Sequence, residues 1–246
     1  MINRFLNIYL LFCITLFSSC EKEHLGDCFK STGAIIQESR PAQAGSFRAI
    51  DISKKVDVII RQGAAEEITV EAGENIIGGI TTRIENNTLF ITNENKCNWV
   101  RSYSNPVNVY VTIPDLRQII QNGNGRITSD GVLSLDTLYM ETWNSGDIKL
   151  QLESDLIENR QHVTVGDVEL TGHTRKLYVF NNGNGFCYLS GLEAKIAQVD
   201  SRGTGDTHVR VDSLLEYGIL GMGNIYLYGP ATASGSISGT GSLIRK

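Results

Sequence analysis

The chain has 246 residues and a formal net charge of −5, with 41% hydrophobic and 20% charged residues. This balance excludes a disordered chain and a protein that crosses a membrane many times, and the length is enough for one or two folded domains. The mild acidity argues against nucleic acid and anionic membrane surfaces as partners.

The first nineteen residues have the pattern of an export signal. Arg4 precedes a largely apolar run over residues 5–17, which is too short to span a bilayer comfortably, and small residues then lead to Cys20. This order resembles a bacterial lipoprotein signal, in which the Cys becomes the acylated N-terminus; an ordinary cleaved signal and an uncleaved anchor are the alternatives. We predict a lipoprotein signal peptide over residues 1–19 and lipidation of Cys20, which would hold the exported chain at the outer membrane or cell surface.

Three cysteines remain beyond the predicted lipidation site. Cys28 and Cys97 lie in polar segments without periodicity, whereas Cys187 takes an apolar position in a strand. An exported chain meets an oxidising environment, so we predict a disulfide between Cys28 and Cys97 and a buried thiol at Cys187. The Cys and His spacings are not those of a metal site, and we expect neither a metal nor a cofactor.

Residues 20–44 are polar and are expected to form a tether, with a single β domain over residues 45–246. Six apolar or alternating runs predict strands that end at turn residues. The runs cover residues 47–52, 56–63, 68–73, 80–84, 88–92 and 107–114. Residues 85–87 between two of these runs favour a hairpin turn, and helical periodicity is absent from the sequence.

From residue 116 onward, a Gly-containing pattern returns about every 20 residues, a period typical of solenoids. The aligned residues are Gly125, Gly146, Gly166, Gly185, Gly205, Gly223 and Gly241, with spacings of 21, 20, 19, 20, 18 and 18. A phosphate-binding loop would need a helix after the glycines, and strand residues follow instead. We therefore expect each Gly to form a sharp corner and to adopt a positive φ there.

The period also predicts which side chains point into the solenoid. Residues two and four positions after each Gly, and four and six positions before it, should lie inside. The polar members near the corner, such as Gln121 and Asn181, should form a ladder of hydrogen bonds. The turn that ends at Gly166 is irregular, because residues 158–162 do not give the inner column.

Several of these segments together resemble a known family. The runs are Phe-Arg-Ala-Ile-Asp-Ile from residue 47, Val-Asp-Val-Ile-Ile from 56, Leu-Phe-Ile from 89 and Val-Tyr-Val-Thr-Ile-Pro-Asp-Leu from 109. With the repeated Gly corners, they resemble the head GIN domain family of putative auto-transporter adhesins over about residues 45–244. The resemblance implies an all-β, single-stranded, right-handed parallel β-helix in an exported and often lipid-anchored protein, and it carries over no catalytic residue.

A ligand surface must lie in the outward columns. Parity places Tyr139, Trp143, Tyr178 and Phe180 on the outside, on two turns separated by a third that offers Asn159, Gln161 and Val163. Exposed aromatic residues can stack on sugar rings or contact a protein. The alternative is that the tether, the first strands or a neighbouring subunit covers them.

Charged residues near the corners have two readings. Lys149 and Glu169 should form an opposite-charge pair across neighbouring turns. Asp147 and Asp167 are also one turn apart, close enough to share a calcium ion or to act as paired carboxylates. Asp beside Gly is equally ordinary turn chemistry.

The sequence thus predicts an exported, lipid-anchored, non-enzymatic surface module, an adhesin that binds a glycan or a protein. One alternative is an assembly protein whose open last turn, near residues 242–244, pairs with another chain into a homo-oligomer. The other is a polysaccharide lyase or hydrolase that uses Asp147 and Asp167.

Overall fold

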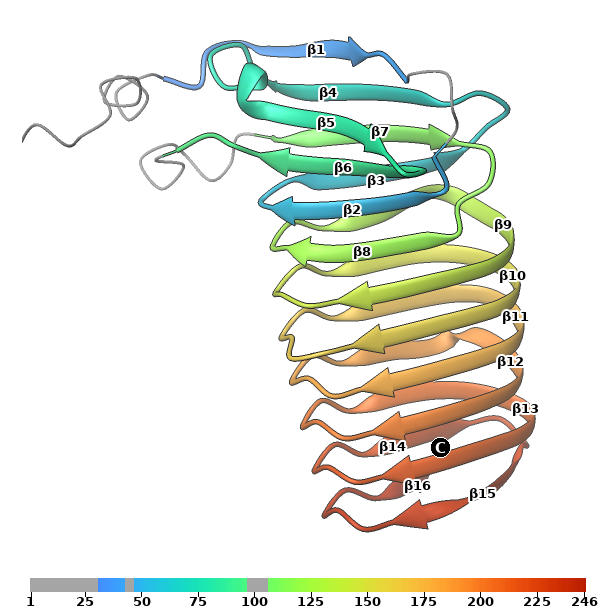
Figure 1. The fold of residues 1–246 in the computed structure, drawn as a ribbon. Helices are drawn as coiled ribbons and strands as arrows, with labels where there is room; N and C mark the ends of the chain where they lie inside the picture. The colour runs from blue at the N-terminus through green and yellow to red at the C-terminus, as the bar shows by residue number, and fades with distance from the viewer. Residues whose placement is uncertain (1–30, 43–46, 97–105) are drawn as a thin grey trace, which may run out of the picture.

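The computed structural model describes residues 31–42, 47–96 and 106–246. They form a parallel β-solenoid in which Ile148 pairs with Val168 and Val168 pairs with Cys187, one turn further on each time (Figure 1). The predicted all-β solenoid is confirmed: beside its strands, this part of the chain contains one short 3-10 turn, η2 (Ile77–Gly79). It includes no helix long and apolar enough to cross a membrane.

Several predictions concern residues outside these ranges. The signal peptide over residues 1–19, the lipidation site Cys20 and both partners of the disulfide between Cys28 and Cys97 lie there. They therefore stay predictions.

Five long strands form the C-terminal part of the solenoid, and each wraps most of one turn. They are β9 (Ile127–Thr142), β10 (Ile148–Gln161), β11 (Val168–Asn181), β12 (Cys187–Ser201) and β13 (Thr207–Ile219). The first half of each strand lies in what we call the back sheet, and the second half lies in the front sheet, which faces the viewer in Figure 1. β14 (Ile225–Tyr228) and β16 (Leu243–Arg245) extend the back sheet, and β15 (Thr232–Ile237) extends the front sheet.

The first turn of the chain lies between two turns that come later in the sequence. It consists of β2 (Ala49–Lys54) in the front sheet and β3 (Asp57–Gln62) in the back sheet. β2 pairs in parallel with β6 (Thr88–Asn93) on one side and with β8 (Gln118–Gly123) on the other. β3 likewise pairs with β7 (Asn108–Ile113) and β9. The sequence predicts strands at these places, but not this spatial order.

Three antiparallel strands complete the N-terminal end. In the back sheet β4 (Glu67–Gly73) pairs with β7, and β1 (Ile35–Arg40) pairs with β4; in the front sheet β5 (Ile80–Glu85) pairs with β6. Asn86 and Asn87 have φ of 49° and 61° and join β5 to β6, which confirms the predicted hairpin. β1 falls inside the expected tether of residues 20–44, so the ordered fold begins earlier than the sequence indicates.

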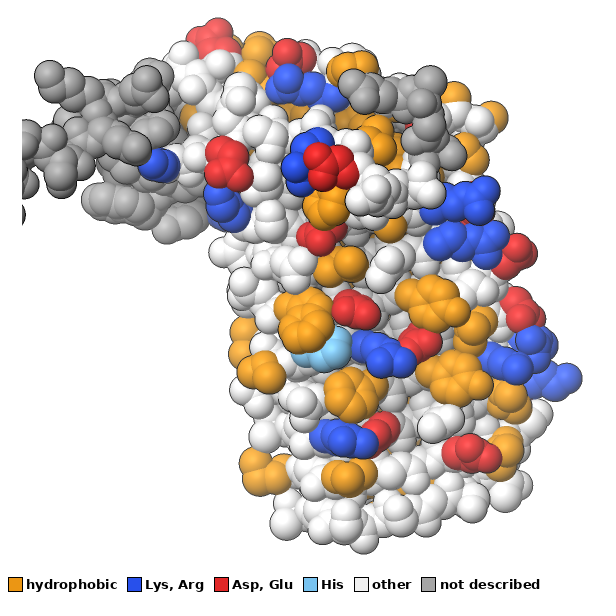
Figure 2. Space-filling model, in the orientation of Figure 1, with side chains coloured by type: hydrophobic (Ala, Val, Ile, Leu, Met, Phe, Trp, Pro, Cys, Tyr) orange, Lys and Arg blue, Asp and Glu red, His pale blue; other side chains and the backbone are white. Residues whose placement is uncertain are grey.

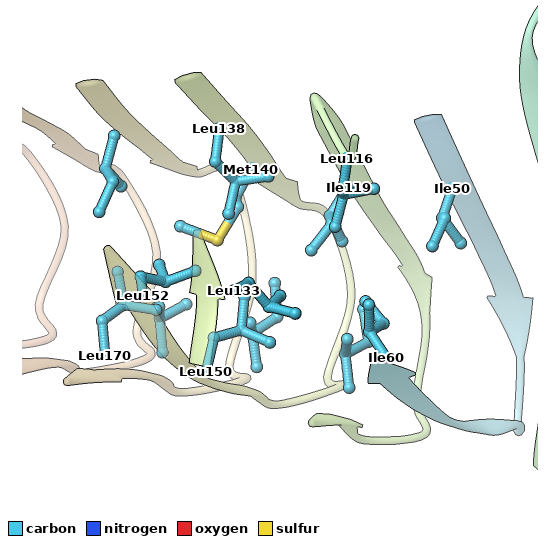
Figure 3. Close-up of a cluster of buried hydrophobic side chains, with 14 of the residues drawn as sticks. Ile50, Ile60, Leu116, Ile119, Leu133, Leu138, Met140, Leu150, Leu152 and Leu170 are labelled. Atoms are coloured by element: carbon cyan, nitrogen blue, oxygen red, sulfur yellow. The ribbon is translucent and has the colours of Figure 1, made fainter. Parts of the chain in front are cut away.

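The core fills the space between the two sheets. Figure 3 shows side chains from both sheets, among them Met140 and Leu150, pointing toward one another. The inner column two residues after each corner Gly is fully buried from Ile127 to Ile225, and only its last member, Leu243, is partly buried. Burial of one such side chain contributes about 1.5–3 kcal/mol relative to leaving it in water, so these columns dominate the stability of the solenoid.

The corner glycines are needed for a reason other than the one predicted. Among the glycines of the described residues, positive φ occurs at Gly33, Gly131, Gly172 and Gly229, and at none of the aligned corner positions. A Cβ on Gly185 would instead collide with the carbonyl oxygen of Gly166 on the preceding turn, and one on Gly205 would collide with that of Gly185. The sharp corners are present, but the expectation of positive φ is wrong: each Gly leaves room for the backbone of its neighbour.

Buried amides hold these corners closed, as predicted. Gln121 Nε2 donates to Gly125 O at 2.8 Å, and Asn181 Nδ2 donates to Gly185 O at 3.2 Å. Both side chains are fully buried. Because a buried carbonyl without a hydrogen bond costs about 1–3 kcal/mol, the amides are part of the fold rather than an imperfection in an apolar core.

The turn that ends at Gly166 was expected to lack its inner column, and that expectation is wrong. Asn159 and Gln161 are fully buried and fill the column, and Gln161 Nε2 donates to Gly166 O at 2.8 Å. Gln161 lies five residues before its Gly, whereas Gln121 lies four residues before Gly125. One additional residue in the corner therefore shifts the parity of this turn.

The close approach at the corners gives a stability test. We expect Gly185→Ala to lower the free energy of unfolding by about 3 kcal/mol, because the methyl group must force two turns apart. Gly78→Ala is the matched control, since nothing lies within 4 Å of a Cβ at that position, and it should change stability by less than about 0.5 kcal/mol. Urea denaturation followed by circular dichroism measures both; equal losses would contradict the packing argument.

Candidate functional site

The four predicted aromatic residues lie on one face of the molecule. Tyr139 and Trp143 come from the end of β9 and the corner after it, and Tyr178 and Phe180 come from the end of β11, all on the front sheet. Tyr139, Trp143 and Tyr178 are 42%, 49% and 37% exposed. Figure 2 shows hydrophobic side chains on this face interleaved with acidic and basic ones.

The strand register determines how these residues are spaced. Tyr139 and Tyr178 share a column with Glu158 between them, because Glu158 pairs with both. Neighbouring strands are about 4.8 Å apart, so the two tyrosines are separated by roughly 10 Å. They form two platforms in one column rather than a single contact.

His162 joins the other two aromatic residues, and the sequence argument missed it. Its ring stacks on Trp143 with centroids 3.6 Å apart and an interplanar angle of 11°, and it lies 6.0 Å from the Phe180 ring. Trp143 Nε1 donates to Glu141 at 3.2 Å, which fixes the indole. Trp143, His162 and Phe180, together with Tyr139 and Tyr178, are called the front patch below.

His162 was not predicted because the parity is shifted in its turn, which lies between the turns of Trp143 and Phe180. Asn159 and Gln161 were expected to point outward there, but they are buried, and of the three residues expected outside only Val163 is exposed. The outward positions belong to Glu158, Arg160 and His162. The five-residue distance from Gln161 to Gly166 was the available signal.

A shallow hollow lies between the rings of Tyr178 and Phe180, with a volume of about 360 Å³. The other residues around it are Glu158, Arg160, Val179, Gln198 and Asp200. A second hollow of about 220 Å³ is also lined by Tyr178 and Gln198, together with the apolar side chains Ile196 and Leu214. Tyr178 therefore stands between two depressions of the front sheet.

Two ion pairs position the charged groups of the front patch. Arg160 pairs with Glu158, and Arg202 pairs with Asp200 at 2.8 Å while its guanidinium lies 5.4 Å from the centre of the Phe180 ring. Such exposed pairs contribute little stability, about 0–1 kcal/mol. Their effect is to hold hydrogen-bonding groups beside aromatic rings.

Asp147 and Asp167 have backbone partners. Asp147 Oδ1 accepts the N–H of Asp167 at 3.1 Å, and Asp167 Oδ1 accepts the N–H of Phe186 at 2.8 Å. Asp206 does the same for the N–H of Asn224 at 2.7 Å. Calcium needs six to eight oxygen ligands, and the described ranges contain no group of three or more His, Cys, Asp or Glu residues that could hold a metal. These carboxylates link successive corners through hydrogen bonds, as expected for Asp beside Gly in ordinary turns.

The outward column three residues after the corner Gly holds a second set of rings. Lys149 and Glu169 form the predicted pair at 3.0 Å. Further along, His208 stacks on Tyr226 with centroids 4.5 Å apart and on Tyr188 at 5.7 Å. The rings cover one another on the back sheet, so they offer edges rather than free faces. Burial lowers the pKa of His208 from its ordinary value.

Cys187 is the predicted buried thiol, and it is confirmed as free and fully buried. Its Sγ lies 2.6 Å from Gln161 Oε1, to which it donates. Burial raises the pKa of the thiol to about 12. The group is therefore neutral and unreactive in the folded chain.

Comparison with known proteins agrees with this fold. The model of a family described as putative auto-transporter adhesin, head GIN domain, matches residues 46–231. A crystal structure of a putative adhesin from Bacteroides fragilis is similar, with 22% identity, a TM-score of 0.79, and 87% of this chain and 97% of that chain covered. A putative lipid binding protein from Parabacteroides distasonis is also similar, with 18% identity, a TM-score of 0.68, and 88% of this chain and 98% of that chain covered. A putative adhesin from Parabacteroides merdae has 16% identity and a TM-score of 0.62, again with 88% of this chain and 98% of that chain covered. No curated protein matches the sequence.

The corner carboxylates give a paired test. Asp167→Asn keeps an oxygen that can accept the N–H of Phe186 and should leave stability within about 0.5 kcal/mol, as Asn224 does naturally for Ser242. Asp167→Ala removes the acceptor and should cost about 1 kcal/mol. Urea midpoints of the two variants measure the difference; a loss as large in the Asn variant would show that charge, not the hydrogen bond, matters.

His208 predicts a pH dependence. Because its pKa is lowered in the fold, the unfolded chain binds the proton more readily, so its contribution to stability is complete above the unfolded value of about 6.5 and declines as the pH falls below it. His208→Phe keeps a ring between Tyr188 and Tyr226 and should remove that part of the slope. The slope is measured from unfolding free energies of both variants at a series of pH values between about 5 and about 8. An unchanged slope would assign the effect to other groups.

Proposed function

Because this chain belongs to the head GIN domain family of putative auto-transporter adhesins, we propose that it is a non-enzymatic surface module whose front patch binds a carbohydrate. Lipidation at Cys20 would hold it at the outer membrane or cell surface. The disulfide between Cys28 and Cys97 would brace the start of the exported domain. A protein ligand is the alternative on the same patch.

The hollow between Tyr178 and Phe180 carries this proposal. A sugar ring has apolar C–H faces and a rim of hydroxyls, so it suits a site with aromatic walls and polar groups at its edge. Here two rings bound one depression, and the carboxylates of Glu158 and Asp200, the amide of Gln198 and the guanidinium of Arg160 surround it. A purely apolar protein ligand would leave the amide of Gln198 and the remaining hydrogen-bonding positions of the two ion pairs unused.

The remaining members of the front patch extend the binding surface. Trp143 and His162 continue from Phe180 toward the corner of the solenoid, and Tyr139 lies two strands away from Tyr178. Separate platforms fit an oligosaccharide better than one monosaccharide. Several weak stacking contacts, each worth about 0.5–1.5 kcal/mol, would then add to useful affinity.

Enzymatic use of Asp147 and Asp167 is less well supported. Both carboxylates accept hydrogen bonds from the backbone of the following turn. A general acid or nucleophile must be free to exchange protons or bonds with a substrate. The same pair serves the corner without any substrate.

Single substitutions on a glycan array test the proposal. We expect Tyr178→Ala and Trp143→Ala each to weaken binding about five- to tenfold, as loss of one stacking contact implies, while circular dichroism shows an intact fold. Phe186→Ala is the matched control, because this aromatic residue is 36% exposed, lies directly before β12 and stacks on Tyr188, outside the front patch. Binding that is unchanged in both patch variants, or lost equally in the control, would overturn the proposal.

A further inference from the structure

The two sheets do not end at the same level at the N-terminal end of the solenoid. Beyond the turn formed by β6 and β7, the back sheet continues with β4 and then β1, whereas the front sheet continues with β5 alone. Figure 1 shows β1 at the end of the molecule with no labelled strand in front of it. In the part of the chain that the structure describes, the front sheet is therefore one strand short.

The outer edge of β5 has backbone groups available for such a strand. Gly79 O accepts the N–H of Glu94, so by alternation Thr81 and Arg83 direct their backbone N–H and C=O groups toward β6. In an antiparallel strand, the backbone groups of alternate residues face opposite neighbours. The backbone N–H and C=O groups of Thr82 and Ile84 therefore point away from β6, toward the free edge of the sheet. Among the described residues, no backbone hydrogen bond from another element reaches these two.

A groove runs along this edge and has room for a segment. Its volume is about 370 Å³, within the range of ligand sites. Ile68 and Leu89 line it from inside, and Ile84 and Arg40 line it from β5 and β1. It therefore combines an apolar floor, a free strand edge and the two arginines Arg40 and Arg83.

Arg40 is incompletely satisfied in the groove. Its Nη2 pairs with Glu38 at 2.8 Å and donates to Ile77 O at 3.3 Å. Its Nε is buried and has no hydrogen-bond partner. A buried donor left unpaired is costly, so a carboxylate that reached Nε would bind favourably.

We propose that the free edge of β5 receives an extended segment of a partner polypeptide, which pairs with Thr82 and Ile84, packs apolar side chains on Ile68 and Leu89, and places a carboxylate at Arg40. Strand addition of this kind takes its affinity from the backbone and its specificity from alternate side chains. A lipid or a sugar could fill the groove but could not match the backbone groups of two alternate residues. The site is independent of the front patch.

The charges of the groove disfavour a second copy of this chain as the occupant. A second copy of β5 would bring no free carboxylate to Arg40, because Glu38 is already paired with Arg40 and Glu85 with Arg83. An acidic partner strand has the complementary charge. We therefore assign the edge to a different polypeptide with alternating apolar residues and at least one Asp or Glu.

The first experiment measures peptide binding by fluorescence anisotropy on the purified chain. The probe is a labelled peptide Thr-Val-Thr-Val-Thr-Glu-Thr-Val, in which Glu lies on the same face as the Val residues, and its counterpart has Lys in place of Glu. We expect the Glu peptide to bind roughly tenfold more tightly than the Lys peptide, and Arg40→Gln to remove the preference. Equal binding of both peptides, or binding of neither, would overturn the proposal.

Two variants of one residue separate edge pairing from a folding defect. Thr82→Pro removes an outward N–H without touching the hydrogen bonds to β6, and it should abolish peptide binding. Thr82→Val keeps the N–H and the branched shape and should bind like the unchanged chain. Binding that survives Thr82→Pro would place the peptide elsewhere.

Amide hydrogen exchange identifies the occupant. The N–H groups of Thr82 and Ile84 should exchange quickly in the free chain and slowly with the Glu peptide, whereas that of Arg83 is protected in both states. Protection of Thr82 in the free chain at every dilution would show that the chain covers its own edge. Protection that grows with protein concentration, together with a dimer in light scattering, would identify a second copy. Either result would overturn the assignment to a partner.

Discussion

The close contact between backbones at the corners is the constraint on which the rest of the structure depends. Gly185 sits against the carbonyl oxygen of Gly166, and Gly205 sits against that of Gly185, with no side chain between them. This contact fixes the distance between successive turns at the corner of the solenoid. Buried amides such as Gln161 then satisfy the corner carbonyls, and the strands that leave the corner inherit a parallel register. The outward columns, and any ligand surface built from them, follow from that register.

The same regularity explains what could be predicted from the sequence. A fixed period places equivalent residues on top of one another, so the pair of Lys149 with Glu169 and the hydrogen bond of Gln121 in the corner follow from counting alone. The role of the glycines did not follow, because Gly is required both by positive φ and by close approach of another backbone. Only the positions of the neighbouring turns distinguish these two reasons.

Two failures have a different origin. One additional residue before Gly166 reverses which side chains of that turn face outward. Asn159 therefore lies in the core, and His162 lies in the front patch, contrary to the expectation from the average period. A period averaged over many turns conceals such a shift. The insertion of β2 and β3 between later turns was also hidden, since pairing of Val58 with Ile127 spans most of the first half of the domain and leaves no local mark.

That insertion has a consequence for how the molecule can change in length. A solenoid made of consecutive turns can gain or lose a repeat at either end, because each turn contacts only its neighbours. Here β2 and β3 are enclosed by strands that follow them in the sequence, so their removal would leave a gap inside the stack rather than a shorter stack. Duplication or deletion of whole turns is open only to the C-terminal repeats. Variation in length among such proteins should therefore fall beyond β9, while the N-terminal arrangement stays constant.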